Sequence, residues 1–179
     1  MSSPQRPPRR GFLEKSIALV FGLASLAVPS IAGILAFLNP WRQKGGSGDA
    51  IRVANLASLA VGGPPQSFPV IADRTDAWNR FPAEPIGTVF LRRVSEQEVA
   101  ALQAICPHAG CLVGFDGKAG CFQCPCHGSK FDAEGRRTEA HSISPRDLDG
   151  LEVEIRNRNE VWLRFRKFQT GTPEKIAKN

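Results

Sequence analysis

Hydropathy divides the chain into one apolar run near the N-terminus and a long body of mixed character. Residues 16–38 form a stretch of 23 residues without a charged side chain. As an α-helix this stretch would be roughly 35 Å long, enough for a hydrocarbon core of about 30 Å. Pro29 lies inside it, but a helix in lipid tolerates an internal proline more readily than one in water. The pattern therefore predicts one transmembrane anchor over residues 16–38.

The polar residues before this run indicate how the chain is exported. Residues 1–15 contain the pair Arg9-Arg10, followed by Phe12, Leu13 and Lys15. This order is typical of a twin-arginine export signal, although it would also serve as the positive flank of a membrane helix. We expect residues 1–15 to be a cytoplasmic twin-arginine signal region.

The charges also predict the orientation of the anchor. More positive charge lies before the run than directly after it, where Arg42 and Lys44 stand. The bias favours a cytoplasmic N-terminus and a body on the periplasmic or outer face of the cell membrane. A cleavage site with small residues exists at Ser30-Ile31-Ala32, but the apolar run continues to Leu38, so an uncleaved anchor is expected.

A glycine-rich segment separates the anchor from the body. Residues 43–49 contain three glycines and no apolar side chain, so the segment has little surface to bury. We interpret residues 39–50 as a flexible hinge and residues 51–179 as one domain.

The body has the pattern of an all-β domain. Short apolar or alternating runs recur between Gly, Pro and Asp residues, and no long 3.6-residue period follows residue 50. Turns are expected at residues 116–120 and 157–159, and Trp78 and Trp162 are expected in the core. The predicted strands are residues 51–54, 67–71, 88–94, 99–105, 112–115, 121–123, 130–131, 151–156 and 160–166.

Composition excludes one class of function. The formal net charge is +6, about half of it in the first 15 residues, and the rest is dispersed over a mixed-charge body. No basic stripe interleaved with aromatic residues is present, so nucleic acid is not an expected partner.

Two short runs carry most of the chain's metal-binding side chains. Cys106 and His108 form C-x-H, and after fifteen intervening residues Cys124 and His127 form C-x-x-H. Such a donor set suits a tetrahedral zinc ion or a [2Fe–2S] cluster, and metal-free disulfide loops are a further alternative. Because each run offers one Cys and one His, the set favours a cluster in which one iron takes both sulfurs and the other takes both nitrogens.

The runs CPHAGC (106–111) and CPCHGS (124–129) resemble the two boxes of a Rieske iron–sulfur protein. The resemblance implies a Rieske fold, with antiparallel base sheets and an inserted cluster-binding lobe at about 105–145, and one [2Fe–2S] cluster per chain. It further implies that Cys106 and Cys124 bind one iron, and that His108 and His127 bind the other. Ser129 matches a serine that donates a hydrogen bond to a bridging sulfur.

The extra cysteines select a branch of the family. The resemblance implies a disulfide between Cys111 and Cys126, which indicates an oxidising compartment. This version resembles the iron–sulfur subunit of quinol-oxidising cytochrome bc and bf complexes. The fifth cysteine, Cys121, is expected as a small buried thiol in a strand.

The resemblance also implies an activity. The chain would be the electron-transfer subunit of an oxidoreductase, inactive alone, with a cytochrome b-type subunit and a cytochrome c-type or similar acceptor as partners. It would take one electron and a proton from a quinol, menaquinol or ubiquinol. His127 is the expected quinol contact and His108 the second candidate.

Two alternatives stay open within the same resemblance. The small subunit of an arsenite-oxidase-like molybdenum enzyme has a similar clamp and export signal. A free-standing ferredoxin is the other alternative, but the membrane segment and the extra cysteine pair disfavour it. Gly128, the long helix and the glycine linker favour the quinol-oxidising complex.

The sequence departs from the family pattern in ways that carry predictions. Phe131 stands where high-potential members have a tyrosine that donates to a cysteine sulfur, and the chain contains no tyrosine. A lost donor lowers the reduction potential, so we predict an intermediate potential suited to menaquinol. Ala109 stands where a larger residue is common, which affects docking. Ser144-Pro145 is either a loop covering the cluster or a simple turn, and residues 168–175 resemble the tails of bacterial relatives or form a solvated end.

Overall fold

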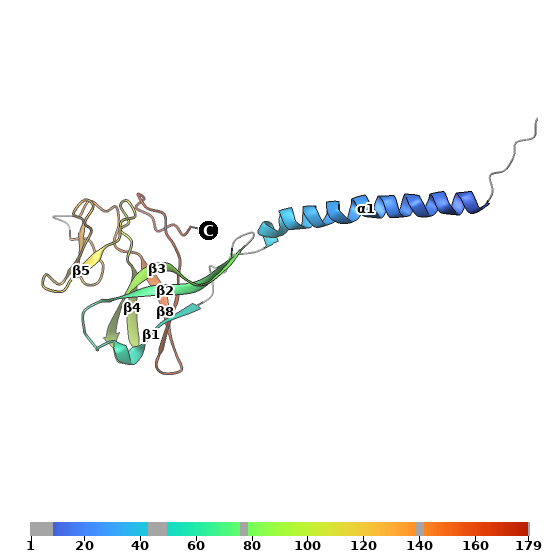
Figure 1. The fold of residues 1–179 in the computed structure, drawn as a ribbon. Helices are drawn as coiled ribbons and strands as arrows, with labels where there is room; N and C mark the ends of the chain where they lie inside the picture. Colours follow the sequence, from blue (N-terminus) through green and yellow to red (C-terminus); the bar gives the residue numbers. More distant parts are fainter. Residues whose placement is uncertain (1–8, 43–49, 76–78, 139–141, 179) are drawn as a thin grey trace, which may run out of the picture. The chain divides into compact units, whose positions relative to one another are not determined.

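The computed structural model describes residues 9–42, 50–75, 79–138 and 142–178. The chain forms two compact units, residues 1–44 and residues 45–179, and each is described by itself. Figure 1 shows the first as a single helix and the second as a β domain.

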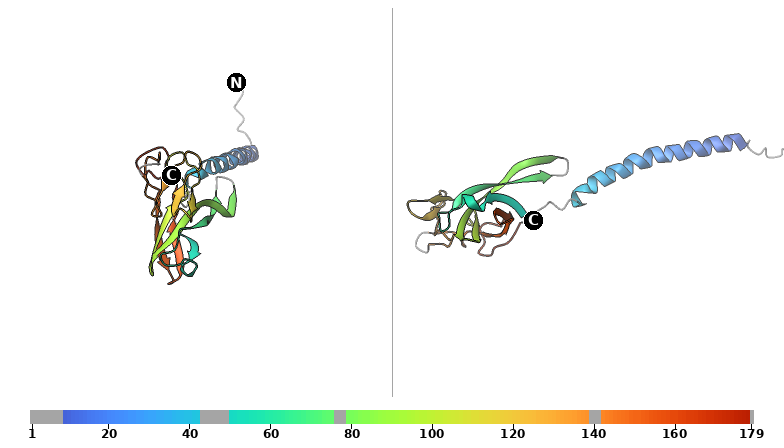
Figure 2. Two further views of the ribbon diagram at one scale, coloured as in Figure 1. Left: turned by 90° about the vertical axis from the view of Figure 1, so that its left-hand side faces the viewer. Right: turned by 90° about the horizontal axis from the view of Figure 1, so that it is seen from below.

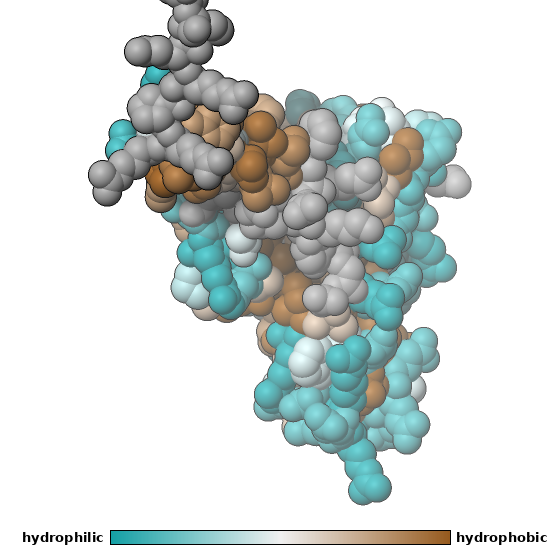
Figure 3. Space-filling view, turned by 90° about the vertical axis from the view of Figure 1, so that its right-hand side faces the viewer, coloured by the Kyte–Doolittle hydropathy of each residue, from teal (hydrophilic) through white to brown (hydrophobic). Residues whose placement is uncertain are grey.

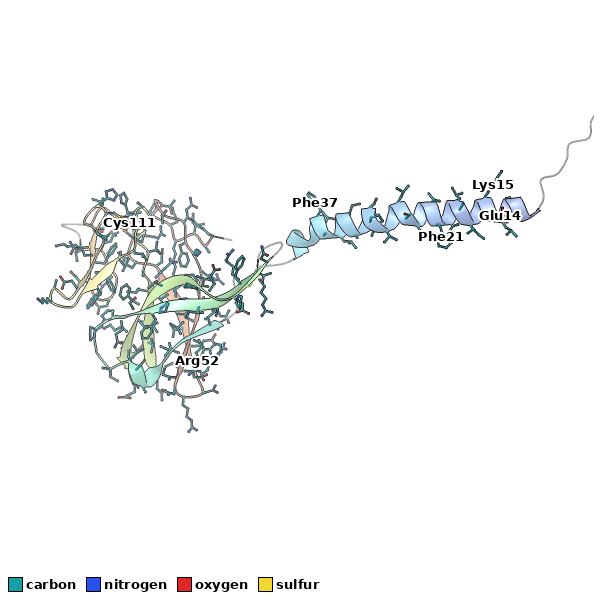
Figure 4. The ribbon with its side chains drawn as sticks, viewed as in Figure 1. Glu14, Lys15, Phe21, Phe37, Arg52 and Cys111 are labelled. Carbon is teal, nitrogen blue, oxygen red and sulfur yellow. A yellow bond between two sulfur atoms is a disulfide. The ribbon has the colours of Figure 1, made fainter. Side chains whose placement is uncertain are left out.

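The first unit is the helix α1, Arg9–Arg42, which exceeds the predicted anchor at both ends. Its apolar part, Gly11–Leu38, has 28 residues and a mean hydropathy of 2.2, long and apolar enough to cross a membrane. Figure 4 shows Phe21 and Phe37 pointing away from the helix axis, and these side chains are 72% and 78% exposed. A helix with apolar side chains on all sides suits a lipid environment better than water.

Both ends of the predicted hinge at residues 39–50 lie in regular elements. The helix backbone continues to Arg42, and the first strand begins at Ala50. Residues 43–49, which contain the three glycines, lie outside the described residues, so the flexibility of this segment stays a prediction.

The second unit is built on one antiparallel sheet of six strands in the order β1-β9-β8-β4-β3-β2. A 3₁₀ turn, Leu56–Ser58, follows β1. The strands at the two ends of the order, β1 and β2, are in contact with each other, so the sheet curls. The strands are β1 (Ala50–Asn55), β2 (Gln66–Thr75), β3 (Arg80–Ser95), β4 (Glu98–Gln103), β8 (Gly150–Arg156) and β9 (Glu160–Arg164).

A smaller lobe is inserted between β4 and β8. Its three-stranded antiparallel sheet has the order β5-β6-β7, with β5 at Gly114–Asp116, β6 at Cys121–Gln123 and β7 at Lys130–Phe131. This arrangement confirms the predicted all-β fold with an inserted lobe.

Strand β3 separates the cores of the base sheet and the lobe. Successive side chains of a strand point to opposite faces. Val89 and Leu91, both 0% exposed, pack in the base core, whereas Phe90 between them packs in the lobe core with Phe122 and Phe131. The lobe core therefore rests directly on the base sheet.

The hairpin of β2 and β3 is longer than predicted. Both views in Figure 2 show it extending beyond the rest of the sheet. The predicted strands covered residues 67–71 and 88–94, and the part that they left out contains Pro82 and Pro85, which lack the N–H that a strand donates. The structure accommodates them beside shifts in register, and Arg74 stacks 4.3 Å from the centre of the Phe81 ring.

The turn predicted at residues 157–159 joins β8 to β9. Asn157 and Arg158 have φ values of 50° and 62°, the left-handed pair that tight hairpins use. Figure 3 shows the hydrophilic lower end of the β unit, where this turn lies. Trp162 in β9 is only half-buried beneath the Arg156 guanidinium, so its assignment to the core was wrong, and Trp78 lies outside the described residues.

Candidate metal centre

Two loops of the lobe, each six residues long, contain the candidate metal-binding residues. We call residues 106–111 loop 1 and residues 124–129 loop 2. In both loops the first residue donates its N–H to the carbonyl of the sixth, and the fifth donates to the first. The donor–acceptor pairs are Cys106 to Cys111 (2.8 Å), Gly110 to Cys106 (3.0 Å), Cys124 to Ser129 (2.9 Å) and Gly128 to Cys124 (3.1 Å).

A glycine at the fifth position lets both loops close in the same way. Gly110 has a φ of 84° and Gly128 a φ of 74°, in the left-handed region where a side chain is strained. The two loops thus share one backbone conformation, although their sequences place the histidine at the third position in loop 1 and the fourth in loop 2.

A disulfide between Cys111 and Cys126 joins the two loops, with an S–S distance of 2.03 Å. It confirms the pairing expected from the sequence, and Figure 4 labels Cys111 within the lobe. Cys121 lies in β6 as expected, but it is half-exposed because the adjacent Phe122 occupies the face of the strand that is buried. The expectation that Cys121 is buried was wrong.

The remaining sulfur and nitrogen donors differ in exposure. The Cys106 and Cys124 side chains are buried, at 1% and 2% exposure, in the lobe core beside Phe122 and Phe131. His108 is half-buried and His127 is exposed. Their rings meet edge to face with centroids 4.9 Å apart. The site therefore has sulfur on its inner side and imidazole on its outer side.

The electrostatic surroundings of Cys106 follow from its burial. Desolvation raises the pKa of this thiol above its ordinary value, because the charged form loses its hydration. The backbone N–H of His108 opposes this change, and the neighbouring Cys124 thiol adds to it. Binding of a metal ion would have to displace the proton that burial favours.

The hydroxyl of Ser129 is a hydrogen-bond donor that a bound group could use. Its side chain is 0% exposed, and its hydroxyl has no hydrogen-bond partner among the described residues. It lies close enough to the Cys106 thiol to lower the pKa of that group. A buried hydroxyl without a partner is costly, so a sulfur acceptor of a bound cluster fits this position.

Proximity alone would suggest a different metal site. The sulfur atoms of Cys111, Cys124 and Cys126 all lie within 4.8 Å of one another. Two of them are bonded to each other, however, and a disulfide provides no thiolate ligand. The pair Cys106 and Cys124, with the two histidines, is the donor set that is chemically available.

The structure adds two elements to the site that the sequence indicated only weakly. Gly171 in the C-terminal segment donates its N–H to the carbonyl of Pro107, inside loop 1, at 2.8 Å. Arg137 donates to the carbonyls of Ser144 and Pro145, at 3.3 and 3.2 Å, so this segment is a fixed turn. That the turn covers a cluster stays a prediction.

Comparison with known families gives a match over the β domain. The Rieske [2Fe–2S] domain profile matches residues 58–153, a range that contains both loops.

Among curated proteins, the chain is similar to iron–sulfur subunits of membrane complexes. The cytochrome b6-f complex iron–sulfur subunit of Chlorobaculum tepidum is 32% identical over 128 residues, 72% of this chain and 61% of that protein. The subunit of the same name from Prochlorococcus marinus subsp. pastoris is 32% identical over 133 residues, 72% of this chain and 70% of that protein. The menaquinol:cytochrome c reductase iron–sulfur subunit of Bacillus subtilis is 28% identical over 155 residues, 83% and 87% of the two chains. The chain thus spans about three fifths of the Chlorobaculum protein.

Two solved structures are similar in fold. The plasma membrane Rieske protein PetC3 of Synechocystis PCC 6803 has a TM-score of 0.44 and 24% identity, covering 63% of this chain and 97% of that one. A chain of a hyperthermophilic respiratory Complex III has a TM-score of 0.44 and 17% identity, covering 79% and 98%.

Proposed function

The chain belongs to the Rieske [2Fe–2S] domain family, and from that premise we propose that it is the iron–sulfur subunit of a membrane quinol-oxidising complex of the cytochrome bc or b6f type. Its cofactor is a Rieske [2Fe–2S] cluster. The names of the Chlorobaculum and Bacillus relatives support the assignment to such a complex. A cytochrome b-type subunit and a cytochrome c-type acceptor are the partners in this proposal.

In this proposal helix α1 anchors the subunit in the cell membrane. The apolar part, Gly11–Leu38, has the length and hydropathy that a span requires. The N-terminus lies in the cytoplasm, because positive charge is concentrated before the helix, and the β domain lies on the periplasmic or outer face. Export through the twin-arginine route would allow the β domain to cross the membrane folded with its cofactor.

The four donors divide between the two irons according to their exposure. Cys106 and Cys124 would hold one iron, and His108 and His127 would hold the other. The burial of the two thiols in the lobe core and the contact between the two imidazole rings support this division. The Ser129 hydroxyl would donate its hydrogen bond to a cluster sulfur, which would supply the partner that it lacks among the described residues.

Exposure also determines which residue meets the substrate. A bound cluster supplies one-electron chemistry at a potential that histidine ligands raise. His127 is exposed, so its ring nitrogen that does not hold the metal would, once deprotonated, accept the hydrogen bond of a quinol hydroxyl and then its proton. His108 is half-buried and is the second candidate for this role.

We favour menaquinol as the substrate. Phe131 is 0% exposed and packs with both cysteine ligands, at the position where high-potential members have a tyrosine hydroxyl. Without that donor the reduced cluster is less stabilised, so the potential is lower and better matched to menaquinol. The Bacillus relative is named as a menaquinol reductase subunit.

The single observation that carries the proposal is the placement of two buried thiols behind two imidazoles at the surface. In such a site the buried thiols would hold the metal group from within, while an exposed imidazole could exchange a proton with a molecule outside. A structural zinc site has no need of this polarity, because its four ligands enclose the ion.

The ligand assignment is tested by histidine substitutions in the full-length chain in its native membrane. His127→Ala and His108→Ala should each abolish the Rieske EPR signal and reduce quinol oxidation to background. His141→Ala is the matched control, since it removes the chain's third histidine, which lies outside both motifs. A full complement of iron and unchanged electron flow in His127→Ala would overturn the assignment.

The assignment to a complex is tested by purifying that complex from membranes. We expect b-type haem to co-purify and a quinol-site inhibitor to block electron flow. Molybdenum in place of b-type haem would instead identify an arsenite-oxidase-like enzyme.

A further inference from the structure

The C-terminal segment of the β domain forms a hairpin. Residues 167–178, which we call the C-terminal hairpin, are paired by two backbone hydrogen bonds: Gln169 donates to Ile176 (2.8 Å) and Lys178 donates to Lys167 (2.7 Å). Phe168 is 9% exposed, and the Lys175 ammonium lies 4.7 Å from the centre of its ring. The same ammonium donates to the Gly150 carbonyl at the start of β8 (2.5 Å). The segment is thus an ordered part of the domain.

The tip of the C-terminal hairpin contacts loop 1. The Gly171 N–H donates to the Pro107 carbonyl at 2.8 Å, between the residues that we assign to the two irons. A β-carbon on Gly171 would lie 3.7 Å from the His108 carbonyl oxygen, and one on Gly110 would lie 3.7 Å from the Thr170 methyl group. The backbones of the tip and loop 1 are therefore in close contact.

A buried arginine fixes the tip in place. Arg146 is 8% exposed, and its guanidinium binds both oxygens of Asp149, at 2.9 and 2.8 Å. Its remaining N–H groups donate to the carbonyls of Gln169 (2.7 Å) and Thr172 (2.5 Å), which flank Gly171 on both sides. The bidentate pair and these two carbonyls use four of the five N–H groups of the guanidinium, and the Thr172 hydroxyl lies 3.4 Å from Nη1, which makes this geometry specific.

The arginine is in turn connected to the strand that leads into loop 1. The Asp149 carbonyl accepts the N–H of Gln103, at the end of β4 and three residues before Cys106, at 2.8 Å. The Gln103 side-chain amide donates to the Arg166 carbonyl, just before the C-terminal hairpin, at 3.2 Å. The network therefore connects the end of β4, which leads into loop 1, to the C-terminal hairpin.

We propose that Arg146 and the C-terminal hairpin are positioning elements that hold loop 1, and with it His108, in the geometry needed for cluster binding. This inference rests on the proposed assignment of His108 as an iron ligand. Loop 2 has no such hydrogen-bonded support: within the described part of the chain its backbone hydrogen bonds outside the strands are internal, and the disulfide is its covalent link to loop 1. Loss of the hairpin therefore acts on loop 1 first.

The first test compares the full-length chain with a truncated chain that retains the anchor helix and ends after Phe168. Hydrogen exchange measured by mass spectrometry compares peptides that cover the two loops. We expect exchange in loop 1 to be about tenfold faster, the effect of one lost hydrogen bond, and exchange in loop 2 to change less than about twofold. The amides of Gly110 and Gly128 make equivalent hydrogen bonds in their own loops, so loop 2 serves as the internal control. This measurement uses the apoprotein and does not depend on the identity of the ligands.

The second test uses the cluster-loaded chain. Arg146→Gln should shift the EPR g-values of the reduced cluster and increase the rate of bleaching by an iron chelator about tenfold. Arg146→Lys should be intermediate, because an ammonium reaches fewer of the four acceptors. Arg164→Gln, which removes an exposed guanidinium of β9, is the control and should match the wild type.

The outcomes separate positioning from general stability. Unchanged loop 1 exchange, together with unchanged g-values, would overturn the proposal. Equal acceleration throughout β8, β9 and both loops would show a merely structural role and would overturn it as well. If loop 1 exchange rises but His108→Ala keeps the EPR signal, the positioning holds and the ligand assignment fails.

Discussion

Loop 1 and loop 2 have the same internal hydrogen bonds but different supports. Loop 1 is joined to the C-terminal hairpin through Pro107, and its His108 is half-buried. Loop 2 is held from outside by its disulfide to loop 1, and its His127 is exposed. The local sequence thus determines the loop backbone, whereas the surrounding segments determine which histidine is exposed to a substrate.

The largest effect should come from removing the link between the loops. The double substitution Cys111→Ser and Cys126→Ser removes the disulfide without leaving an odd thiol. We expect a loss of about 3 kcal/mol in the free energy of unfolding, the value for a loop of this size, and loss of most of the cluster. Thermal unfolding and EPR of the full-length chain measure these effects. Cys121→Ser is the control, and a cluster content equal to wild type in the double variant would show that loop 2 needs no clamp.

Cys111 and Ser129 both occupy the sixth position of their loops. The Cys111 side chain is used in the disulfide, whereas the Ser129 hydroxyl is available to donate a hydrogen bond. Ser129→Ala should lower the cluster potential by about 60 to 130 mV, the equivalent of one hydrogen bond to a charged group. In the apoprotein the same change should increase stability by about 1 kcal/mol, because a buried hydroxyl without a partner among the described residues is removed. Redox titration measures the decrease in potential, and thermal unfolding measures the increase in stability. A potential equal to wild type would reject the donor role.

The residues that follow the loops allow a matched pair of substitutions. Phe131 lies seven positions after Cys124, and Val113 lies seven after Cys106; both are buried. Phe131→Tyr should raise the potential by about 40 mV, the equivalent of about 1 kcal/mol, by adding a donor to sulfur. Val113→Thr adds a hydroxyl on the loop 1 side and should leave the potential nearly unchanged. Redox titration of both variants decides the assignment, and an unchanged potential in Phe131→Tyr would contradict the role given to Phe131.

The smallest effect concerns the apoprotein at alkaline pH. Burial raises the pKa of the Cys106 thiol above its ordinary value of 9.0, so the folded state binds this proton more tightly than the unfolded state. The resulting stability is fully present below pH 9 and is lost as the pH rises through the raised pKa. Urea unfolding between about pH 7 and 11 should show a steeper loss in wild-type apoprotein than in Cys106→Ser. Parallel curves for the two chains would contradict this account of loop 1.

Much of the site could be predicted because its chemistry is local. The donors of each loop lie within four residues, and the fifth-position glycines Gly110 and Gly128 are what the shared turn requires. The disulfide was predicted from a family resemblance rather than from geometry. The alternation of short apolar runs was sufficient to predict the all-β domain, and the resemblance supplied the inserted lobe.

The errors have physical causes. The predicted strands 67–71 and 88–94 were too short, because register shifts beside Pro82 and Pro85 let the hairpin of β2 and β3 continue. Cys121 and Trp162 were expected inside because of their residue types, whereas each lies on the less buried face of its strand. Residue type does not tell which face of a strand meets a core.

The sequence by itself determined the long apolar helix and the closed backbone of the two loops, and it predicted the metal donors, because each depends on residues close together in the chain. Only the tertiary structure decided that two thiols are buried while His127 is exposed, that Ser129 lacks a partner among the described residues, and that Arg146 joins the C-terminal hairpin to loop 1. Arg146 reaches its two carbonyl acceptors in the hairpin across 23 and 26 positions of the chain. Pairs so far apart leave no periodic signal that a sequence pattern could reveal.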